Sequence, residues 1–209
     1  MGLKTLDEIG IHFQTDKASR FTRTYAKPHD YLRHLEPFFE PLRGEPVRFL
    51  EIGAAGGESI QTWLEYFPSS MAKIFGVDNN QGTNPWNTVN SGADPRYTFV
   101  YGDQTDKTMW ACFAANYGKD FDVIMDDGGH YNDQIIIAFG CLWPMLKSGG
   151  LYIIEDLGCS YGAGSIFVKP GYPNHMQWLY NGVDGMNQLA GSEISEMHFS
   201  RELVIMRKK

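Results

Sequence analysis

The segment DDGGH, residues 126–130, leaves an apolar run through two adjacent carboxylates, two glycines and a histidine. Adjacent carboxylates repel each other, so a nearby positive charge is expected to offset them. A bound cation is one such charge, and a plain polar turn is the simpler interpretation. His130 can accept a proton near neutral pH, because the unperturbed pKa of an imidazole is about 6.5. Its alternative is a loop histidine that only caps the next helix.

These residues need a scaffold, and the chain alternates short apolar runs with segments of helical periodicity, as is typical of a parallel α/β sheet. The expected strands are residues 47–53, 72–78, 97–103, 121–127 and 151–157. The expected helices between them are residues 58–67, 106–118 and 132–150, with Asp106 as a cap and Gly118 as a stop. Each strand carries an acidic residue at or just before its end, where ligands gather in open α/β sheets. We therefore expect these acids to share one rim.

The remaining segments surround this core. Residues 1–46 are expected to form a helical cap, and residues 158–175, rich in Gly, Pro and Tyr, a long loop. A helix is expected from about residue 176 to 190, and an antiparallel hairpin over 193–209. The prediction is one domain, 1–209, with a Rossmann-like, doubly wound, mostly parallel seven-stranded sheet over 47–209.

Composition excludes several classes of protein. A formal net charge of −7 argues against a nucleic-acid surface, which needs clustered Lys and Arg. Met1 is followed by no apolar signal core, and no apolar run approaches the roughly 18 residues of a membrane span, so we expect a cytoplasmic protein. Cys112, Cys141 and Cys159 form no CxxC pair. The first two are expected to be small buried thiols.

A glycine turn, LEIGAAGGES over residues 50–59, lies between the first expected strand and a helix whose amides could face a ligand. It departs from the dinucleotide fingerprint G-x-G-x-x-G, because two alanines follow Gly53. A pyrophosphate therefore fits poorly. Asp78, 25 residues after Gly53, could accept from both hydroxyls of an adenosine ribose, and Asp103 could meet an adenine edge. Taken singly, either acid could be a plain exposed strand-end carboxylate.

Residues 47–208 resemble the class I S-adenosylmethionine-dependent methyltransferases. The resemblance rests on the E-x-G-x-x-G-G turn, the acid that ends the second expected strand, the GD after the third and the terminal hairpin. Within that class, DDG-x-H followed by IIEDL resembles the magnesium-dependent O-methyltransferases of macrolide sugars and related natural products. QTDKAS also resembles a GTDK-type stretch near the start of such proteins. The chain departs from the pattern at Gly129, where serine is common, and at Gln14, where glycine often stands. The second departure leaves the TDK residues, 15–17, open to interpretation as a solvated polar turn.

The resemblance implies S-adenosylmethionine and Mg²⁺ as cofactors, His130 as general base, and a hydroxyl of a sugar or glycosylated metabolite as acceptor. It implies metal ligation by Asp127, Glu155 and Asp156, although one or two protein carboxylates is the commoner number for Mg²⁺. The residues expected at the cofactor are Glu51, Gly53, Ala54, Gly57, Ser59, Asp78, Asp103, Gln104 and Asp126.

Alternatives remain open at this point. A catechol-like phenol could chelate the same metal, and a metal-free polar rim would need no cation at all. A nicotinamide-dependent oxidoreductase is disfavoured by the missing middle glycine. A binding module without turnover could keep the same fold. Partners in the form of nucleic acid or membrane are not expected, and a homo-oligomer is left open.

Overall fold

A computed structural model describes residues 2–22, 27–79, 87, 90–161, 166–187 and 192–209. The contacts of the chain divide it into two compact units. The first unit comprises Met1–Arg48, Ala54–Gly76 and Asn80–Val100, and the second comprises Phe49–Gly53, Val77–Asn79 and Tyr101–Lys209. The predicted single domain, 1–209, is not tested by this division and stays a prediction. Trp86, for which the sequence leaves an adenine contact, a subunit contact and a local loop anchor open, lies outside the described residues.

Helices dominate the N-terminal part of the first unit. They are α1 (Leu6–Phe13), α2 (Leu32–Phe39), the 3-10 helix η1 (Glu40–Leu42) and α3 (Glu58–Tyr66). Thr5 is the N-cap of α1 and forms a capping box with Glu8. The Thr5 side chain accepts from the backbone N of Glu8, and the Glu8 side chain accepts from the backbone N of Thr5. α1 packs against α2 and α3, with Phe39 and Trp63 fully buried. The described part of residues 1–46 forms helices rather than strands, as predicted, and its role as a cap stays a prediction.

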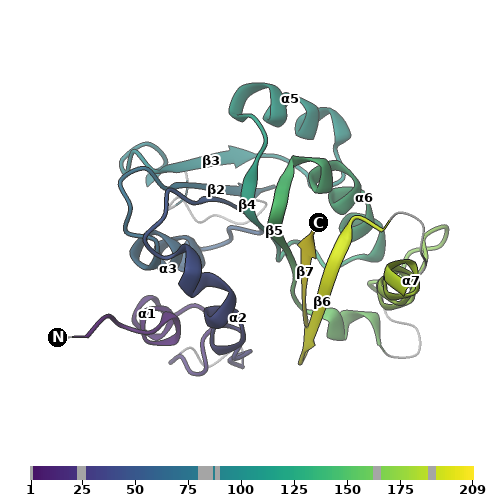
Figure 1. The fold of residues 1–209 in the computed structure, drawn as a ribbon, viewed down its shortest axis with the longest axis horizontal. Helices are drawn as coiled ribbons and strands as arrows, with labels where there is room; N and C mark the ends of the chain where they lie inside the picture. Colours follow the sequence, from purple (N-terminus) through teal and green to yellow (C-terminus); the bar gives the residue numbers. More distant parts are fainter. Residues whose placement is uncertain (1, 23–26, 80–86, 88–89, 162–165, 188–191) are drawn as a thin grey trace. The chain divides into compact units, whose positions relative to one another are not determined.

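Seven strands form one sheet in the order β3-β2-β1-β4-β5-β7-β6 (Figure 1). They are β1 (Arg48–Ile52), β2 (Lys73–Asp78), β3 (Tyr97–Tyr101), β4 (Phe121–Asp126), β5 (Leu146–Ile154), β6 (Ile194–Ser200) and β7 (Leu203–Lys208). β4 is parallel to β1 and β5, and every residue of β4 is buried, as expected of a central parallel strand. β7 is antiparallel to β5 and β6. The predicted mostly parallel sheet with an antiparallel C-terminal hairpin is confirmed.

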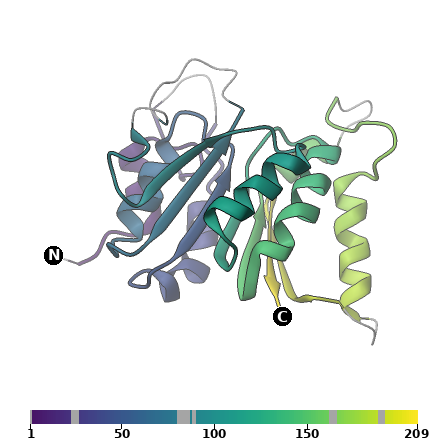
Figure 2. The ribbon, with the colours of Figure 1, turned by 90° about the horizontal axis from the view of Figure 1, so that it is seen from above.

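Three helices of the second unit are α5 (Lys107–Tyr117), α6 (Asn132–Leu142) and α7 (His175–Asn187). Figure 2 shows α5 and α6 side by side, and α6 also packs on β4 and α7. The predicted cap and stop of α5 are confirmed, because Asp106 accepts from the backbone N of Thr108 and Met109, and Gly118 is the C-cap. None of the helices among the described residues is long and apolar enough to cross a membrane.

The predicted helix over 132–150 is too long. α6 ends at Leu142, a 3-10 helix, η2 (Trp143–Met145), follows, and β5 begins at Leu146. Pro144 accounts for the change, because it lacks a backbone N–H and its ring clashes with the preceding helical turn. β5 therefore starts five residues before the predicted strand of 151–157 and ends at Ile154, before the 3-10 helix η3 (Leu157–Ser160).

The prediction of buried cysteines is wrong for Cys112. All three cysteines are free thiols, but Cys112 is exposed and Cys141 and Cys159 are half-buried. The reason lies in α5, which buries only Trp110 and Phe113 and leaves the neighbouring small residues in solvent. A helix that packs along a narrow stripe does not bury every apolar residue in its pattern.

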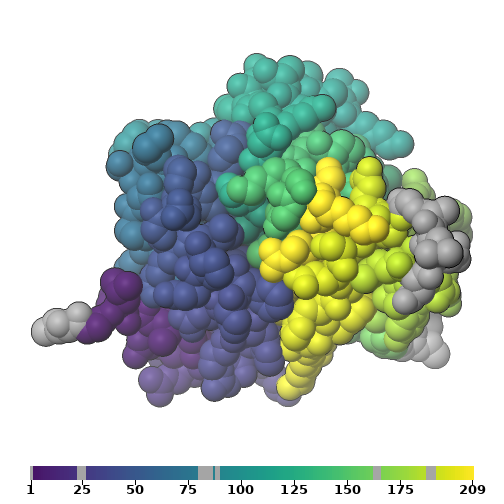
Figure 3. All heavy atoms as spheres, in the orientation of Figure 1, coloured from purple at the N-terminus to yellow at the C-terminus, as the bar shows by residue number. Residues whose placement is uncertain are grey.

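The C-terminal hairpin lies at the surface of the second unit (yellow in Figure 3). β7 is buried from Leu203 to Met206, whereas every residue of β6 is exposed or half-buried. The difference follows from the strand order, because β6 pairs only with β7 and forms an edge of the sheet.

Candidate active site

The carboxyl ends of five strands are joined in a row by backbone hydrogen bonds within the second unit. The bonds run from Gly53 N to Val77 O (2.8 Å), Gly102 N to Asp78 O (3.0 Å), Asp127 N to Ile52 O (3.0 Å) and Glu155 N to Asp126 O (3.1 Å). Three of these residues end β1, β2 and β4, Val77 is the next-to-last residue of β2, and the other four directly follow β1, β3, β4 and β5. The structure therefore brings the acidic strand ends onto one rim of the sheet, as the sequence predicted.

Gly53 sits where the chain leaves β1 and passes close to the chain leaving β4. Its φ is +87°, and a Cβ built there would lie 1.9 Å from the backbone O of Asp127. An L-residue rarely adopts this φ, and the obstructing atom belongs to backbone that cannot rotate aside. Glycine is therefore required here for two separate reasons, and it sets the position of Asp127.

Asp127, His130 and Asp156 gather just beyond the ends of β4 and β5. One ligand atom from each lies within 4.8 Å of the others, and His130 Nε2 is 3.3 Å from Asp156 Oδ2. His130 and Asp156 both have left-handed backbone, with φ of 60° and 56°. Such strain in non-glycine residues persists only where the surrounding structure fixes it, and it is concentrated at functional sites.

The donor atoms of this cluster fit a divalent cation. Two half-buried carboxylates supply the oxygen ligands that Mg²⁺ prefers, and water and substrate usually complete its octahedron. The imidazole is a poorer ligand for Mg²⁺ and a better proton acceptor. Glu155 is buried, 1% exposed, and follows Asp126 in the backbone ladder, but it is not in the cluster that the described residues form. Its role as a third ligand stays a prediction.

Gln104 holds the DDGGH turn in place. Its Nε2 donates to Asp126 Oδ1 over 3.2 Å, and its Oε1 accepts from the backbone N of Gly129 over 2.9 Å. Asp126 Oδ1 also accepts from the backbone N of Gly128. Burial raises the pKa of Asp126 to about 6. The sequence predicted Gln104 and Asp126 at the cofactor, but it gave no signal that their amide and carboxylate would brace this turn.

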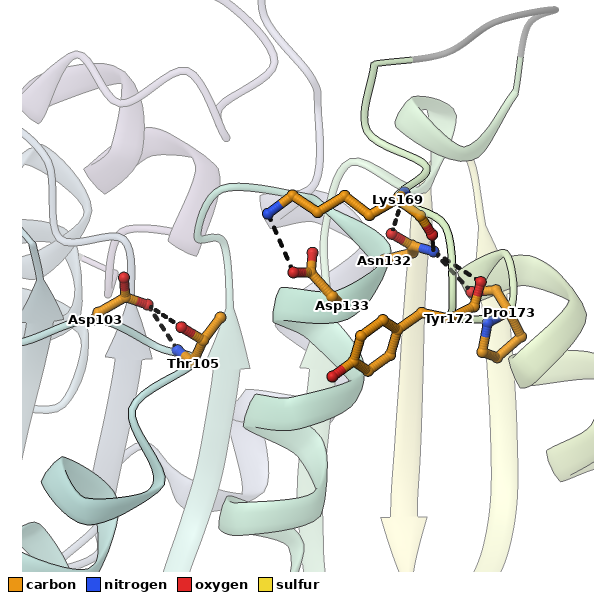
Figure 4. Close-up of polar contacts among 7 residues, drawn as sticks. All are labelled: Asp103, Thr105, Asn132, Asp133, Lys169, Tyr172 and Pro173. Carbon is orange, nitrogen blue, oxygen red and sulfur yellow. Dashed lines mark hydrogen bonds and ion pairs between the residues drawn. The ribbon is translucent and has the colours of Figure 1, made fainter.

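The other predicted cofactor residues of the second unit differ in exposure. Glu51 lies in β1 and is fully buried, whereas Asp78 is half-buried at the end of β2. Asp103 is exposed, and its Oδ1 accepts from the backbone N and Oγ1 of Thr105 over 2.7 and 2.8 Å (Figure 4). Asp103 therefore fixes its own turn. Cofactor binding by these three acids stays a prediction.

The glycine turn of the first unit is fixed by Asn87, which sequence reasoning missed. Asn87 is fully buried, its Nδ2 donates to the backbone O of Ala55 over 2.8 Å, and its Oδ1 accepts from the hydroxyl of Tyr97 over 2.8 Å. Gly57 is the N-cap of α3 and has a φ of +84°. The other predicted cofactor residues of this turn, Ala54 and Ser59, are both buried. Asn87 stands in an aperiodic insert, so no pattern marked it.

The N-terminal QTDKAS segment is not a solvated turn. Thr15 and Lys17 are 3% and 2% exposed, while Asp16 is exposed, so the solvated interpretation is wrong for the first two. Gln14 is the C-cap of α1 and has left-handed backbone, with a φ of 62°. This conformation explains why glycine suits position 14 in similar sequences.

Comparison with known proteins finds one matching family model and several similar proteins. Residues 50–157 match a family model described as a methyltransferase domain. The demethylmacrocin O-methyltransferase of Streptomyces fradiae is 34% identical over 166 residues, which cover 76% of this chain and 38% of that protein. The mycinamicin VI 2''-O-methyltransferase of Micromonospora griseorubida is 32% identical over 151 residues, 69% of this chain and 35% of that protein.

Among solved structures, the MycE methyltransferase from the mycinamycin biosynthetic pathway, in complex with Mg and SAH, is similar with a TM-score of 0.80 and 26% identity. The match covers 99% of this chain and 55% of that chain. The chain spans about half the length of that structure, and less than half of the two curated relatives. Because the family model covers more than half of the 209 residues, the chain belongs to the methyltransferase domain family.

Proposed function

We propose that the protein is a magnesium-dependent O-methyltransferase that moves the methyl group of S-adenosylmethionine to a hydroxyl of a sugar or glycosylated metabolite. The observation that carries the proposal is the cluster of Asp127, His130 and Asp156 on the rim of the sheet. Support for the acceptor class comes from the relatives, which are named for O-methylation of macrolides and of rhamnosyl and olivosyl sugars. Support for the metal comes from MycE, which was crystallised with Mg and SAH.

Each residue has a defined task in this proposal. Asp127 and Asp156 would hold Mg²⁺, with Glu155 as the third predicted ligand. Bound Mg²⁺ would supply Lewis acidity that lowers the pKa of the acceptor hydroxyl. In the neutral His130 ring, a proton on Nε2 shared with Asp156 leaves the lone pair of Nδ1 to accept the hydroxyl proton. Asp156 would therefore orient the base as well as bind the metal.

The sulfonium methyl group of S-adenosylmethionine would be the group transferred. The residues that would hold this cofactor are Glu51, Gly53, Ala54, Gly57, Ser59, Asp78, Asp103, Gln104 and Asp126. Methyl transfer by in-line displacement depends on aligning the acceptor oxygen with the methyl carbon, so positioning supplies much of the rate. The braced DDGGH turn suits this task, because Gln104 and Gly53 fix the backbone on either side of Asp127.

The test combines chelation with ligand variants. EDTA should abolish transfer of labelled methyl to rhamnosides and added Mg²⁺ should restore it. Asp127→Asn, Glu155→Gln and Asp156→Asn should each raise the Mg²⁺ concentration needed for half-maximal rate. Asp184→Asn removes an exposed carboxylate from α7 and should leave that concentration unchanged.

Metal binding can also be read without turnover, by titrating Mn²⁺ and following its electron spin resonance. The same ligand variants should bind Mn²⁺ more weakly than the wild type. Adding a catechol to the acceptor panel tests the phenol alternative. Full activity after exhaustive chelation would contradict the proposal.

A further inference from the structure

Asn132, the first residue of α6, holds a distant segment of chain against the turn that carries His130. It is fully buried, and its backbone N donates to the O of Phe167 over 2.9 Å. Its Nδ2 lies 3.1 Å from each of three backbone oxygens, those of Lys169, Tyr172 and Pro173 (Figure 4). Its Oδ1 accepts from the backbone N of Lys169 over 2.7 Å. One buried amide thus fixes residues 167–173.

A second contact fixes the same segment through side chains. Lys169 Nζ is 3.1 Å from Asp133 Oδ2, a carboxylate that is only 14% exposed (Figure 4). The same ammonium lies over the ring of Tyr131, 4.6 Å from its centroid. Tyr131 and Asp133 flank Asn132, so three consecutive residues directly after His130 bind this segment.

The anchored segment presents apolar side chains beside the proposed base. The Phe167 ring lies 6.5 Å from the His130 ring and 5.2 Å from the Tyr131 ring, measured between centroids. Ile166 is 73% exposed, and Tyr172 is 40% exposed. Exposed apolar side chains on a segment held by hydrogen bonds can be buried by an apolar group of a ligand, and a rigid anchor lowers the entropy lost on binding.

We propose that residues 166–172, held by Asn132, form a subsite for the apolar carrier of a glycoside acceptor, with Phe167 as its specificity-determining residue. This inference rests on the proposed function and names the part of the acceptor that lies next to the methylated sugar. A sugar alone is polar on most of its surface and is bound by hydrogen bonds and by the metal. The exposed Ile166 and the half-buried Phe167 contribute little to binding such a ligand, but they can bury an apolar carrier.

The test compares two acceptors that share one sugar, octyl α-L-rhamnoside and methyl α-L-rhamnoside. Phe167→Ala should raise the KM of the octyl glycoside by about tenfold or more relative to that of the methyl glycoside, because apolar area buried on the carrier is lost. The matched control, Phe199→Ala, removes a 40% exposed phenylalanine from β6 and should leave the ratio unchanged. An unchanged ratio in Phe167→Ala would overturn the inference.

Asn132 acts as a positioning residue, and Asn132→Asp keeps its shape while removing the amide that faces three carbonyl oxygens. The variant should lose the preference for the octyl glycoside as Phe167→Ala does. A purely structural role would instead lower kcat for both glycosides equally and leave the ratio of KM values intact. Asn181→Asp, at an exposed site on α7, is the control for the charge change.

Calorimetry without turnover separates this inference from the proposed function. If the wild type binds the octyl glycoside more tightly than the methyl glycoside and Phe167→Ala does not, the subsite stands even when no methyl is transferred. In that case only the proposed activity fails. If both glycosides bind equally to the wild type and the variant, the subsite is refuted even when methyl transfer is observed.

Discussion

Replacing Gly53 by alanine tests the rim directly, because two separate energetic terms can be read from the structure. The first is backbone strain, since a φ of +87° costs an L-residue about 1–2 kcal/mol. The second is steric, since the new Cβ would lie 1.9 Å from Asp127 O and 2.6 Å from Asp127 C. These are backbone atoms, so the ends of β1 and β4 must separate, and overpacking of this kind costs about 1–3 kcal/mol. The expected loss of unfolding free energy is about 2–5 kcal/mol.

The matched control isolates the steric term. Gly149 has a φ of +76°, and nothing lies within 4 Å of a Cβ built on it. Gly149→Ala should therefore cost only the backbone strain, about 1–2 kcal/mol. Urea unfolding of the two variants should give midpoints that differ by roughly 1 M, with Gly53→Ala the lower.

A functional consequence follows from the same displacement. Moving Asp127 should raise the Mg²⁺ requirement of Gly53→Ala but not of Gly149→Ala, as measured by Mn²⁺ titration of the folded proteins. Equal unfolding midpoints for the two variants would refute the reasoning, because the added Cβ would then have no steric cost where the ends of β1 and β4 approach each other.

Three further predictions concern other residues. His130→Ala and His130→Gly should each lower turnover by roughly 10²-fold or more, with Mn²⁺ binding nearly intact. The glycine variant should be about 1 kcal/mol more stable than the alanine variant, because the φ of residue 130 is 60°. Near-normal turnover of either variant at neutral pH would remove His130 from the mechanism. Asp78→Ala should weaken S-adenosylmethionine binding by about tenfold or more in calorimetry, as charge-assisted hydrogen bonds to the ribose are lost, and an unchanged dissociation constant would place the ribose elsewhere. Hydrogen bonds from Arg96 hold the pKa of the Asp94 carboxyl below its usual 3.8. The ionised carboxylate of Asp94 therefore stabilises the folded protein above pH 3.8, and this stabilisation is lost as the pH falls through the folded-state pKa. Asp94→Asn should therefore lower unfolding free energy at pH 7 by about 0.5–1 kcal/mol and match the wild type in strong acid; a pH-independent difference would contradict this.

The sequence predicted the sheet well because burial on both faces leaves a clear apolar run. β4 is the plainest case, since all of its residues are buried and its run is apolar except for Asp122 and Asp126. The predicted boundary between α6 and β5 was wrong because the buried Met145 and Leu146 continue the apolar pattern past Pro144. Periodicity records which side chains are buried, and a chain that turns while staying buried does not interrupt it.

The site was predicted unevenly for a similar reason. Strand ends collect on one rim in any parallel sheet, so Asp78 and Asp127 could be placed from the pattern alone. The bracing contacts of Gln104 and Asn132 could not be predicted, because their amides bond backbone 25 to 41 residues away and no periodic signal accompanies such contacts. These amides are nonetheless what fixes the turn and the segment beside His130. Hydrogen bonds between a side chain and distant backbone cannot be predicted from a sequence pattern, and only the three-dimensional structure shows them.

At position 129 this chain has glycine, whereas similar sequences commonly have serine, and the contacts around Gly129 explain how the turn is held without that serine. A Cβ built on Gly129 would lie 2.2 Å from Gln134 Oε1, so the glutamine side chain occupies the space that the serine of similar sequences would enter. Gln134 Oε1 is itself buried and accepts no hydrogen bond from the described part of the chain. The turn keeps its shape because Gln104 accepts from the Gly129 backbone N, a bond that is independent of the side chain at 129. The position of His130 therefore depends on the brace from Gln104 more than on the residue before it, and this explains how the chain can lack the serine and retain the cluster.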